Sequence, residues 1–211
     1  MAIQLGRTQR AHSTCRGTLI SAAALLTALA VAGCSDTSND DLAGQYKSGT
    51  TQNYVSGDGA ITQVPPAGRT DPINFDATAS DGTRFTSDAL TGTVVVINFW
   101  YASCPPCRAE AKHLNAVNDR FNDQNVQFIG VNVRDQPSTA EAFERRFKVS
   151  YPSVIDANEG RMQLALSGEV APNAVPTTIV LDTKGRVAAR VLGAIDGPGT
   201  LSALVRDELG S

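Results

Sequence analysis

The chain has 211 residues, of which 42% are hydrophobic and 18% are charged, and its formal net charge is −3. This is an ordinary globular composition, and the chain is long enough for one domain with a substantial core. A mildly acidic chain without a basic stripe excludes a protein that binds nucleic acid through its phosphates.

The first 33 residues have the order of an export signal. Three arginines precede an apolar run over residues 19–32, which is too short for a comfortable transmembrane span. The run ends in LAVAGC, which resembles the lipobox of bacterial lipoproteins, where the cysteine becomes lipidated and N-terminal. We expect residues 1–33 to be a lipoprotein signal peptide and Cys34 to anchor the protein, extracytoplasmic, to the bacterial cell membrane. A plain secretory signal and an uncleaved membrane anchor are the alternatives.

Residues 34–70 are rich in Ser, Thr, Gly, Asp, Asn and Pro, which predicts a flexible tether between the lipid and the domain. Within it, TQNYVSGDGAITQV (residues 51–64) favours at most one short strand that pairs locally. The signal holds three of the 18 basic residues and none of the 21 acidic ones, so the mature chain has a net charge of −6. No polybasic tract is left to hold anionic lipid, so attachment would depend on the acyl chains of Cys34.

From residue 71 the pattern is regular, and we expect residues 71–211 to fold as one domain. INFDATA and TRF flank the turn SDG, which predicts a hairpin, and SDAL favours one helical turn. TVVVINFWY (residues 93–101) and VQFIGVNV (residues 126–133) are β-branched and aromatic runs typical of buried strands. YPSVID, PTTIVLD and RVAARVLG are also expected to be extended, the last two joined by the turn TKG.

Four helices are expected, over residues 105–121, 139–147, 159–166 and 199–209. Ser138 is a plausible N-cap of the second. Apolar residues of the first recur at helical spacing: Ala109, Leu114, Val117 and Phe121. Strands that alternate with helices, followed by a closing hairpin and helix, predict an α/β sheet covered on both faces.

Cysteine usage indicates a chemical site. Of four cysteines, Cys15 lies in the signal and Cys34 would carry lipid, so the domain keeps only Cys104 and Cys107. So close a pair encloses too small a loop to stabilise the fold much. Half of a zinc site is the alternative, but structural zinc needs four ligands and only two histidines are available, so we expect no metal.

The segment NFWYASCPPCRAE explains the spacing of the pair. A buried strand delivers Cys104 to a helix N-terminus, where free N–H groups and the helix dipole lower the pKa of a thiol. Pro105 and Pro106 suit the first helical turn because their missing N–H would be unpaired there. Cys104, which we expect to be exposed, would attack a substrate disulfide, and the less accessible Cys107, one turn along, would resolve the mixed disulfide.

NFW, CPPCRAE, GVNVRD and AVPTTIVLD make residues 72–209 resemble the extracytoplasmic thioredoxin-like proteins TlpA, ResA and CcmG. The resemblance implies a thioredoxin-like fold, with a central mixed sheet flanked by helices, an N-terminal hairpin and a central insertion between Val133 and Val175. It also implies that Pro176 is cis and faces the active-site disulfide. Ser103 stands where many relatives have tryptophan, which alters the surface offered to partners.

Glu110 follows Cys107 by three residues, so the two lie on neighbouring helix faces. Members of the resembled family often carry a glutamate there. A carboxylate close to thiols raises their pKa and can pass protons. The alternative is an ordinary solvated helix residue.

These features predict a membrane-anchored thiol–disulfide oxidoreductase. The resemblance implies a reductase of oxidised cysteine pairs in exported proteins, apocytochrome c among them, with electrons from a membrane thiol donor of the CcdA or DsbD kind. No cofactor is expected. A disulfide-forming oxidase is the alternative within the class, and a peroxidase is a more distant one. A copper-delivery protein on the same fold usually has CXXXC and a distant histidine, whereas here no histidine follows His113.

Overall fold

The computed structural model describes residues 60–169 and 174–210. The predicted signal peptide, Cys34 and most of the predicted tether lie outside these residues. Within the described ranges, no helix has the length and apolar character needed to span a bilayer.

A six-stranded mixed sheet forms the centre, in the order β1-β8-β7-β4-β5-β6. Strand β4 runs parallel to β5, and β5 to β6, whereas β7, β8 and β1 follow on the other side of β4 with antiparallel pairing. Every residue of β4 is buried, as expected for a strand with both faces covered. The strands are β1 (Ala60–Gln63), β4 (Val94–Trp100), β5 (Val126–Asn132), β6 (Ser153–Ile155), β7 (Thr177–Leu181) and β8 (Val187–Leu192).

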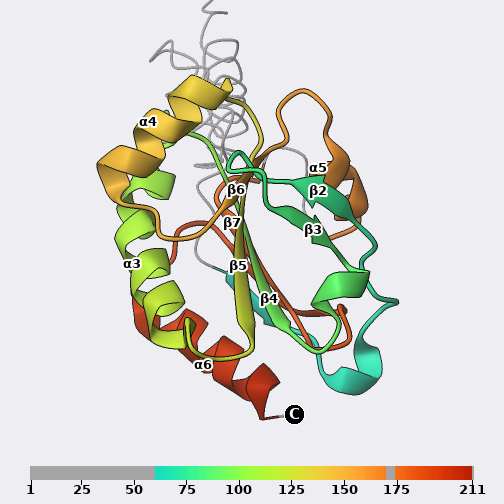
Figure 1. Ribbon diagram of the computed structural model, residues 1–211. Coiled ribbons are helices and arrows are strands. Elements are labelled where there is room, and N and C mark those ends of the chain that lie inside the picture. Colours follow the sequence, from blue (N-terminus) through green and yellow to red (C-terminus); the bar gives the residue numbers. More distant parts are fainter. Residues whose placement is uncertain (1–59, 170–173, 211) are drawn as a thin grey trace, which may run out of the picture. The chain divides into compact units, whose positions relative to one another are not determined.

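Both faces of the sheet are covered (Figure 1). Helices α3, α4 and α6 lie on one side, and α5 lies with the β2–β3 hairpin on the other. The remaining elements are η1 (Pro66–Gly68), β2 (Asp76–Thr78), β3 (Arg84–Thr86), η2 (Asp88–Leu90), α3 (Pro105–Phe121), α4 (Pro137–Phe147), α5 (Arg161–Ala165) and α6 (Pro198–Leu209). The predicted α/β architecture, with its N-terminal hairpin, is confirmed. The segment between Val133 and Val175 holds α4, β6 and α5.

Three details of the predicted helices are wrong. Helix α4 begins at Pro137, with Gln136 at its N-cap, so Ser138 lies inside the helix. Proline has a helical φ and no N–H to lose, and it therefore starts the helix earlier than a hydroxyl cap would. Helix α5 is shorter than expected. Ala109 is exposed, and the buried face of α3 instead includes Cys107 and Glu110.

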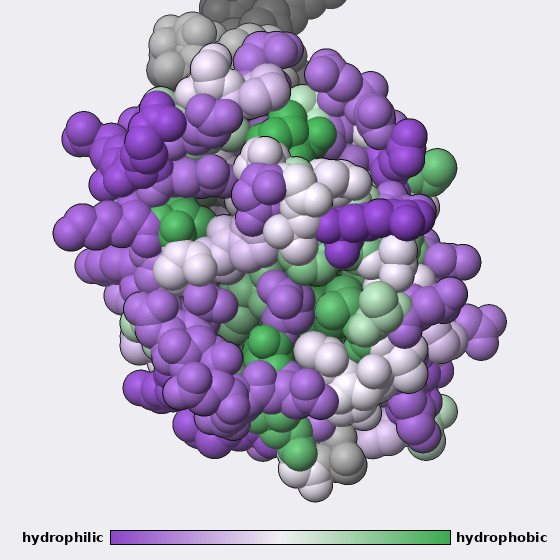
Figure 2. Space-filling view, viewed as in Figure 1, coloured by the Kyte–Doolittle hydropathy of each residue, from purple (hydrophilic) through white to green (hydrophobic). Residues whose placement is uncertain are grey.

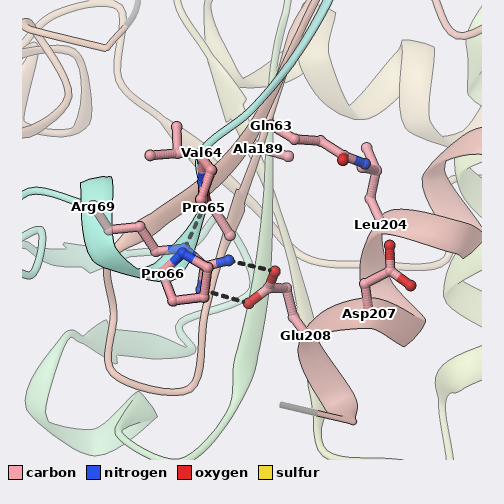
Figure 3. Close-up of a pocket in the computed structure, with 10 residues that line it drawn as sticks. Gln63, Val64, Pro65, Pro66, Arg69, Ala189, Leu204, Asp207 and Glu208 are labelled. Atoms are coloured by element: carbon pink, nitrogen blue, oxygen red, sulfur yellow. Dashed lines mark hydrogen bonds and ion pairs between the residues drawn. The ribbon is translucent and has the colours of Figure 1, made fainter.

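Residues 60–69 belong to the folded domain and not to a tether. Strand β1 pairs antiparallel with β8, placing Ala60 opposite Leu192, so the expectation of local pairing is also wrong. Arg69 then donates a hydrogen bond to Asp182 at 3.0 Å. It also donates to both carboxylate oxygens of Glu208 at 2.7 Å (Figure 3). The folded domain therefore begins no later than residue 60.

Candidate active site

The two cysteines lie at the start of helix α3, just after the buried strand β4 ends. Cys104 is the N-cap residue of α3, and it forms a disulfide with Cys107, their Cα atoms 5.3 Å apart. The backbone N–H of Cys107 donates to Sγ of Cys104 at 3.2 Å. Sγ of Cys104 therefore occupies the position where helix N–H groups and the dipole favour a negative charge, as the sequence predicts.

Both cysteines are buried, which corrects the expectation that the preceding loop leaves Cys104 exposed. The exposed fraction is 0% for Cys104 and 2% for Cys107. Side chains of Trp100, Tyr101 and Val175 share a buried cluster with them. Disulfide exchange with another protein therefore needs a movement that uncovers a sulfur atom.

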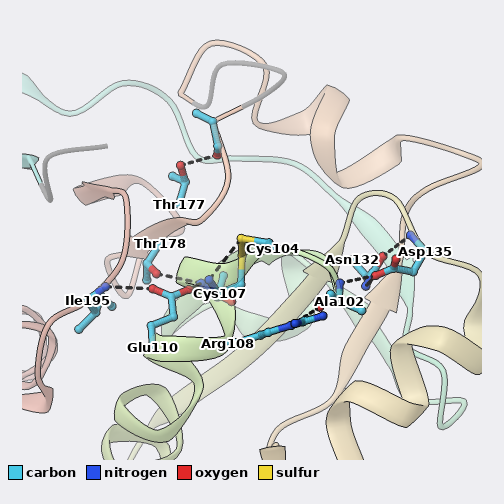
Figure 4. The surroundings of a disulfide bond; sticks show 12 residues. Ala102, Cys104, Cys107, Arg108, Glu110, Asn132, Asp135, Thr177, Thr178 and Ile195 are labelled. Atoms are coloured by element: carbon cyan, nitrogen blue, oxygen red, sulfur yellow. Dashed lines mark hydrogen bonds between the residues drawn. A yellow bond between two sulfur atoms is a disulfide. The ribbon is translucent and has the colours of Figure 1, made fainter. Parts of the chain in front are cut away.

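Glu110 lies one helical turn beyond Cys107 and is fully buried (Figure 4). Its Oε1 accepts a hydrogen bond from Nδ2 of Asn98 at 3.0 Å, and its Oε2 accepts one from the backbone N–H of Ile195 at 3.0 Å. No cation among the described residues pairs with it. Burial raises the pKa of Glu110 to about 7, and the two hydrogen bonds oppose that rise. The structure thus places a carboxyl that titrates near neutral pH next to the cysteines.

Asn98 is a site residue that the sequence reading does not single out. Its Nδ2 also donates to Oγ1 of Thr178 on β7 at 3.1 Å, so one buried amide links two strands to the carboxyl on α3. In the sequence, Asn98 stands out only as a single polar residue inside the apolar run VVVINFW. Since a buried amide needs partners, that position predicts a polar contact nearby without naming it.

The Val175–Pro176 peptide bond is cis, as the family resemblance implies. Val175 shares a buried cluster with Cys104 and Cys107, which places this segment against the disulfide. Ser103 is exposed on the loop before the first cysteine. A small hydroxyl therefore stands at the surface directly before Cys104.

The loop before Cys104 is held on both sides by hydrogen bonds (Figure 4). The N–H of Ala102 donates to Oδ2 of Asp135 at 2.6 Å, and Nε of Arg108 donates to the carbonyl of Ala102 at 2.8 Å. Asn132 in turn donates to Oδ2 of Asp135 at 2.8 Å. The segment GVNVRD thus positions the loop that carries the first cysteine. In the described part of the chain, no cluster of His, Cys, Asp and Glu is placed to hold a metal ion.

Curated relatives of this chain are named for thiol–disulfide chemistry. The chain is 30% identical over 115 residues to the thiol-disulfide oxidoreductase ResA of Halalkalibacterium halodurans. This alignment covers 54% of this chain and 62% of the relative. The chain is 31% identical over 130 residues to the thiol:disulfide interchange protein HelX of Rhodobacter capsulatus, which covers 62% of this chain and 66% of the relative. The chain thus spans somewhat less than two thirds of the length of either relative.

Solved structures give the same fold. A secreted thiol-disulfide isomerase from Corynebacterium glutamicum superposes with a TM-score of 0.65 and 26% identity, over 77% of this chain and 99% of that one. A thiol:disulfide interchange protein of the thioredoxin family from Chlorobium tepidum superposes with a TM-score of 0.61 and 24% identity, over 67% of this chain and 97% of that one. The thioredoxin-like fold is therefore confirmed. Residues 62–206 match the Redoxin family model, and the chain belongs to the Redoxin family.

Proposed function

We propose that the protein is an extracytoplasmic thiol–disulfide oxidoreductase that reduces disulfides in exported proteins. The observation that carries the proposal is the Cys104–Cys107 disulfide at a helix N-terminus, with the buried carboxyl of Glu110 one turn along. The names of the ResA and HelX relatives support the same activity.

The reaction begins from the reduced pair. The thiolate of Cys104 attacks a substrate disulfide, forms a mixed disulfide and displaces one substrate thiolate. Cys107 then attacks Sγ of Cys104, which releases the second substrate thiolate and leaves the pair oxidised. Two electrons pass from the pair to the substrate. We assign the proton of Cys107 to the carboxylate of Glu110, because a group with a pKa of about 7 accepts and returns protons at neutral pH.

The charge near the pair supports the reducing direction. A pair becomes strongly oxidising when its reduced form is stabilised, as in DsbA, with a potential of about −120 mV. A carboxylate beside the thiols disfavours the thiolate and works against that stabilisation. Apocytochrome c is the substrate we favour, with electrons from a membrane thiol donor of the CcdA or DsbD kind. One of the similar structures is a secreted thiol-disulfide isomerase, so an oxidase or isomerase is the second candidate function.

Trapping of partners tests the proposal. We expect the Cys107→Ser variant to accumulate mixed disulfides through Cys104, because the resolving thiol is missing. The matched Cys104→Ser variant should accumulate few. Partners separated on non-reducing gels and identified by mass spectrometry should include an apocytochrome c or the membrane donor. Equal trapping by both variants would refute the assigned roles, and capture of newly exported unfolded chains alone would favour the oxidase.

A further inference from the structure

A hollow of about 380 Å³ opens beside the redox pair. We call it the α4 groove. Its walls are formed by Ala102 and Arg108 near the cysteines and by Thr139, Phe143, Arg146 and Phe147 of α4. In the view of Figure 2, hydrophilic side chains predominate over α3 and α4, with a small hydrophobic patch among them.

The α4 groove adjoins both cysteines along the chain. Ala102 precedes Cys104 by two residues, and Arg108 directly follows Cys107. Two residues of backbone span at most about 7 Å. A polypeptide whose cysteine has reached the pair therefore has its neighbouring residues within reach of this groove.

One wall of the groove is apolar and continuous with the packing around the disulfide. The ring of Phe143 lies 4.4 Å from that of Trp100 and 4.5 Å from that of Phe147, measured between centroids. Phe143 also shares a buried cluster with both cysteines. Phe143 is only 7% exposed and Phe147 is partly exposed, so Phe147 offers most of the aromatic surface to an apolar side chain of a bound segment.

The charged side chains that line the groove are all positive. Arg146 has no ion pair with any described residue, and its guanidinium lies 5.9 Å from the ring centroid of Phe147. Among the described residues, Arg108 donates a side-chain hydrogen bond only from Nε, to the carbonyl of Ala102. The next arginine on the same helix, Arg145, lies outside the groove and pairs with Glu141 at 3.5 Å. The described lining holds two guanidinium groups and no carboxylate, in a chain whose net charge is −3.

We propose that the α4 groove binds the polypeptide substrate next to its cysteine and selects segments that carry Asp or Glu within about three residues of that cysteine, beside an apolar residue. A carboxylate matches the guanidinium groups of Arg108 and Arg146, which bind carboxylates through paired hydrogen bonds. The apolar residue packs on the exposed part of Phe147, beside Phe143. This inference rests on the proposed function and names the substrate class for the same site.

The test measures exchange between the reduced protein and short peptides whose single cysteine is joined to 2-thiopyridine. Attack by Cys104 on the peptide sulfur releases 2-thiopyridone, and attack by Cys107 releases the reduced peptide. The pair is oxidised, and the two thiol protons pass to the two products. Three peptides differ only in the residues that flank the cysteine, which are Glu, Gln or Lys. At physiological ionic strength we expect the Glu peptide to react about tenfold faster than the Lys peptide.

Charge reversal on one helix supplies the control. Arg146→Glu combined with Arg108→Glu should abolish or invert the preference for the Glu peptide. Arg146→Glu alone should weaken the preference. Arg145→Glu makes the same single change of charge on the neighbouring residue, which does not line the groove, so it should leave the preference unchanged. Equal rates for the three peptides, or an equal loss of preference in Arg145→Glu, would overturn the proposal.

A binding measurement separates the groove from the chemistry. Peptides with serine in place of cysteine are titrated into the oxidised protein, and the amide signals of Thr139 and Ala142 are followed by NMR. Chemical-shift changes with the Glu peptide and not with the Lys peptide support binding in the groove, even if the reduced protein does not exchange disulfides with the peptides. In that case only the proposed function is refuted. Exchange without acidic preference in either measurement overturns the groove and leaves the proposed function intact. Failure of both measurements overturns both.

Discussion

Glu110 carries a buried carboxyl whose pKa in the folded protein is about 7, above the ordinary value of 4.5. Folding therefore takes up a proton between those two pH values. The stability that the neutral carboxyl contributes is complete below the unfolded pKa, and it is lost as the pH rises through about 7. Above that pH the native state holds a buried, unpaired carboxylate.

The Glu110→Gln variant should lose this pH dependence, because the amide does not ionise. The difference in unfolding free energy, variant minus wild type, should increase by on the order of 3 kcal/mol between about pH 4 and pH 8. Urea denaturation of the two oxidised proteins at several pH values measures the difference. Parallel pH profiles would contradict the raised pKa. In the reduced variant, thiolate absorbance should also show a lower pKa for at least one cysteine.

Asn98 should tune the same carboxyl. Its N–H favours the charged form of Glu110, so Asn98→Leu, close in size, should raise the pKa of Glu110 above about 7. An NMR titration of the Glu110 side-chain carboxyl measures the change. Thr178→Val is the matched control, because it removes the other contact of the amide and leaves the carboxyl contact in place. Equal shifts in both variants would contradict a direct role for the Asn98–Glu110 bond.

Among the elements, those with local signals were predictable from the sequence. Helix α3 has the predicted bounds, Pro105 to Phe121, because a buried strand, a cysteine cap and two prolines mark its start. The burial of Glu110 was not predictable, since spacing from Cys107 places it on a face without showing what covers that face. The N–H of Ile195, which helps to hold its carboxylate, lies in a distant loop before α6.

The contacts that were not predicted join segments far apart in the sequence. No local pattern shows that Ala60 will lie opposite Leu192, or that Arg69 will meet Asp182 and Glu208. The sequence around β1 is polar and rich in glycine, so its composition predicts a flexible tether. The exposure of Cys104 was predicted from its loop, whereas the cluster that buries it includes Val175, on a segment far along the chain.

The Arg69 cluster should be a major attachment of the N-terminal strand. The exposed fractions of the side chains are 6% for Arg69, 3% for Asp182 and 9% for Glu208, so removing Arg69 takes a buried partner from both carboxylates, although Asp182 keeps Arg186 at 2.8 Å. Arg69→Met should lower the unfolding free energy by about 3 kcal/mol. The measurement is urea denaturation.

The control for this prediction is a second ion pair that is exposed to solvent. The Arg84–Asp76 pair has side chains that are 67% and 53% exposed. Arg84→Met should therefore have a much smaller effect, since solvent screens exposed pairs. Equal losses in the Arg69 and Arg84 variants would show that the buried cluster does not attach β1 and its turn.

For the whole molecule, we propose that its location depends on Cys34. The Cys34→Ala variant should leave the membrane fraction or accumulate as an unprocessed precursor, because lipid is the expected anchor. Cys15→Ala is the matched control, since Cys15 would be removed with the signal peptide. Fractionation and the mass of the mature chain measure both properties. Normal processing and normal membrane retention of the Cys34 variant would refute the lipoprotein assignment.

The reduction potential of the Cys104–Cys107 pair tests the proposed direction of electron flow most directly. It is measured on the mature protein by equilibration with glutathione or dithiothreitol buffers. A reductase whose thiolate is disfavoured by the neighbouring Glu110 carboxylate should have a potential at or below about −200 mV, in the range of glutaredoxins and thioredoxin. A potential near −120 mV, that of DsbA, would contradict the reductase and identify the pair as an oxidant.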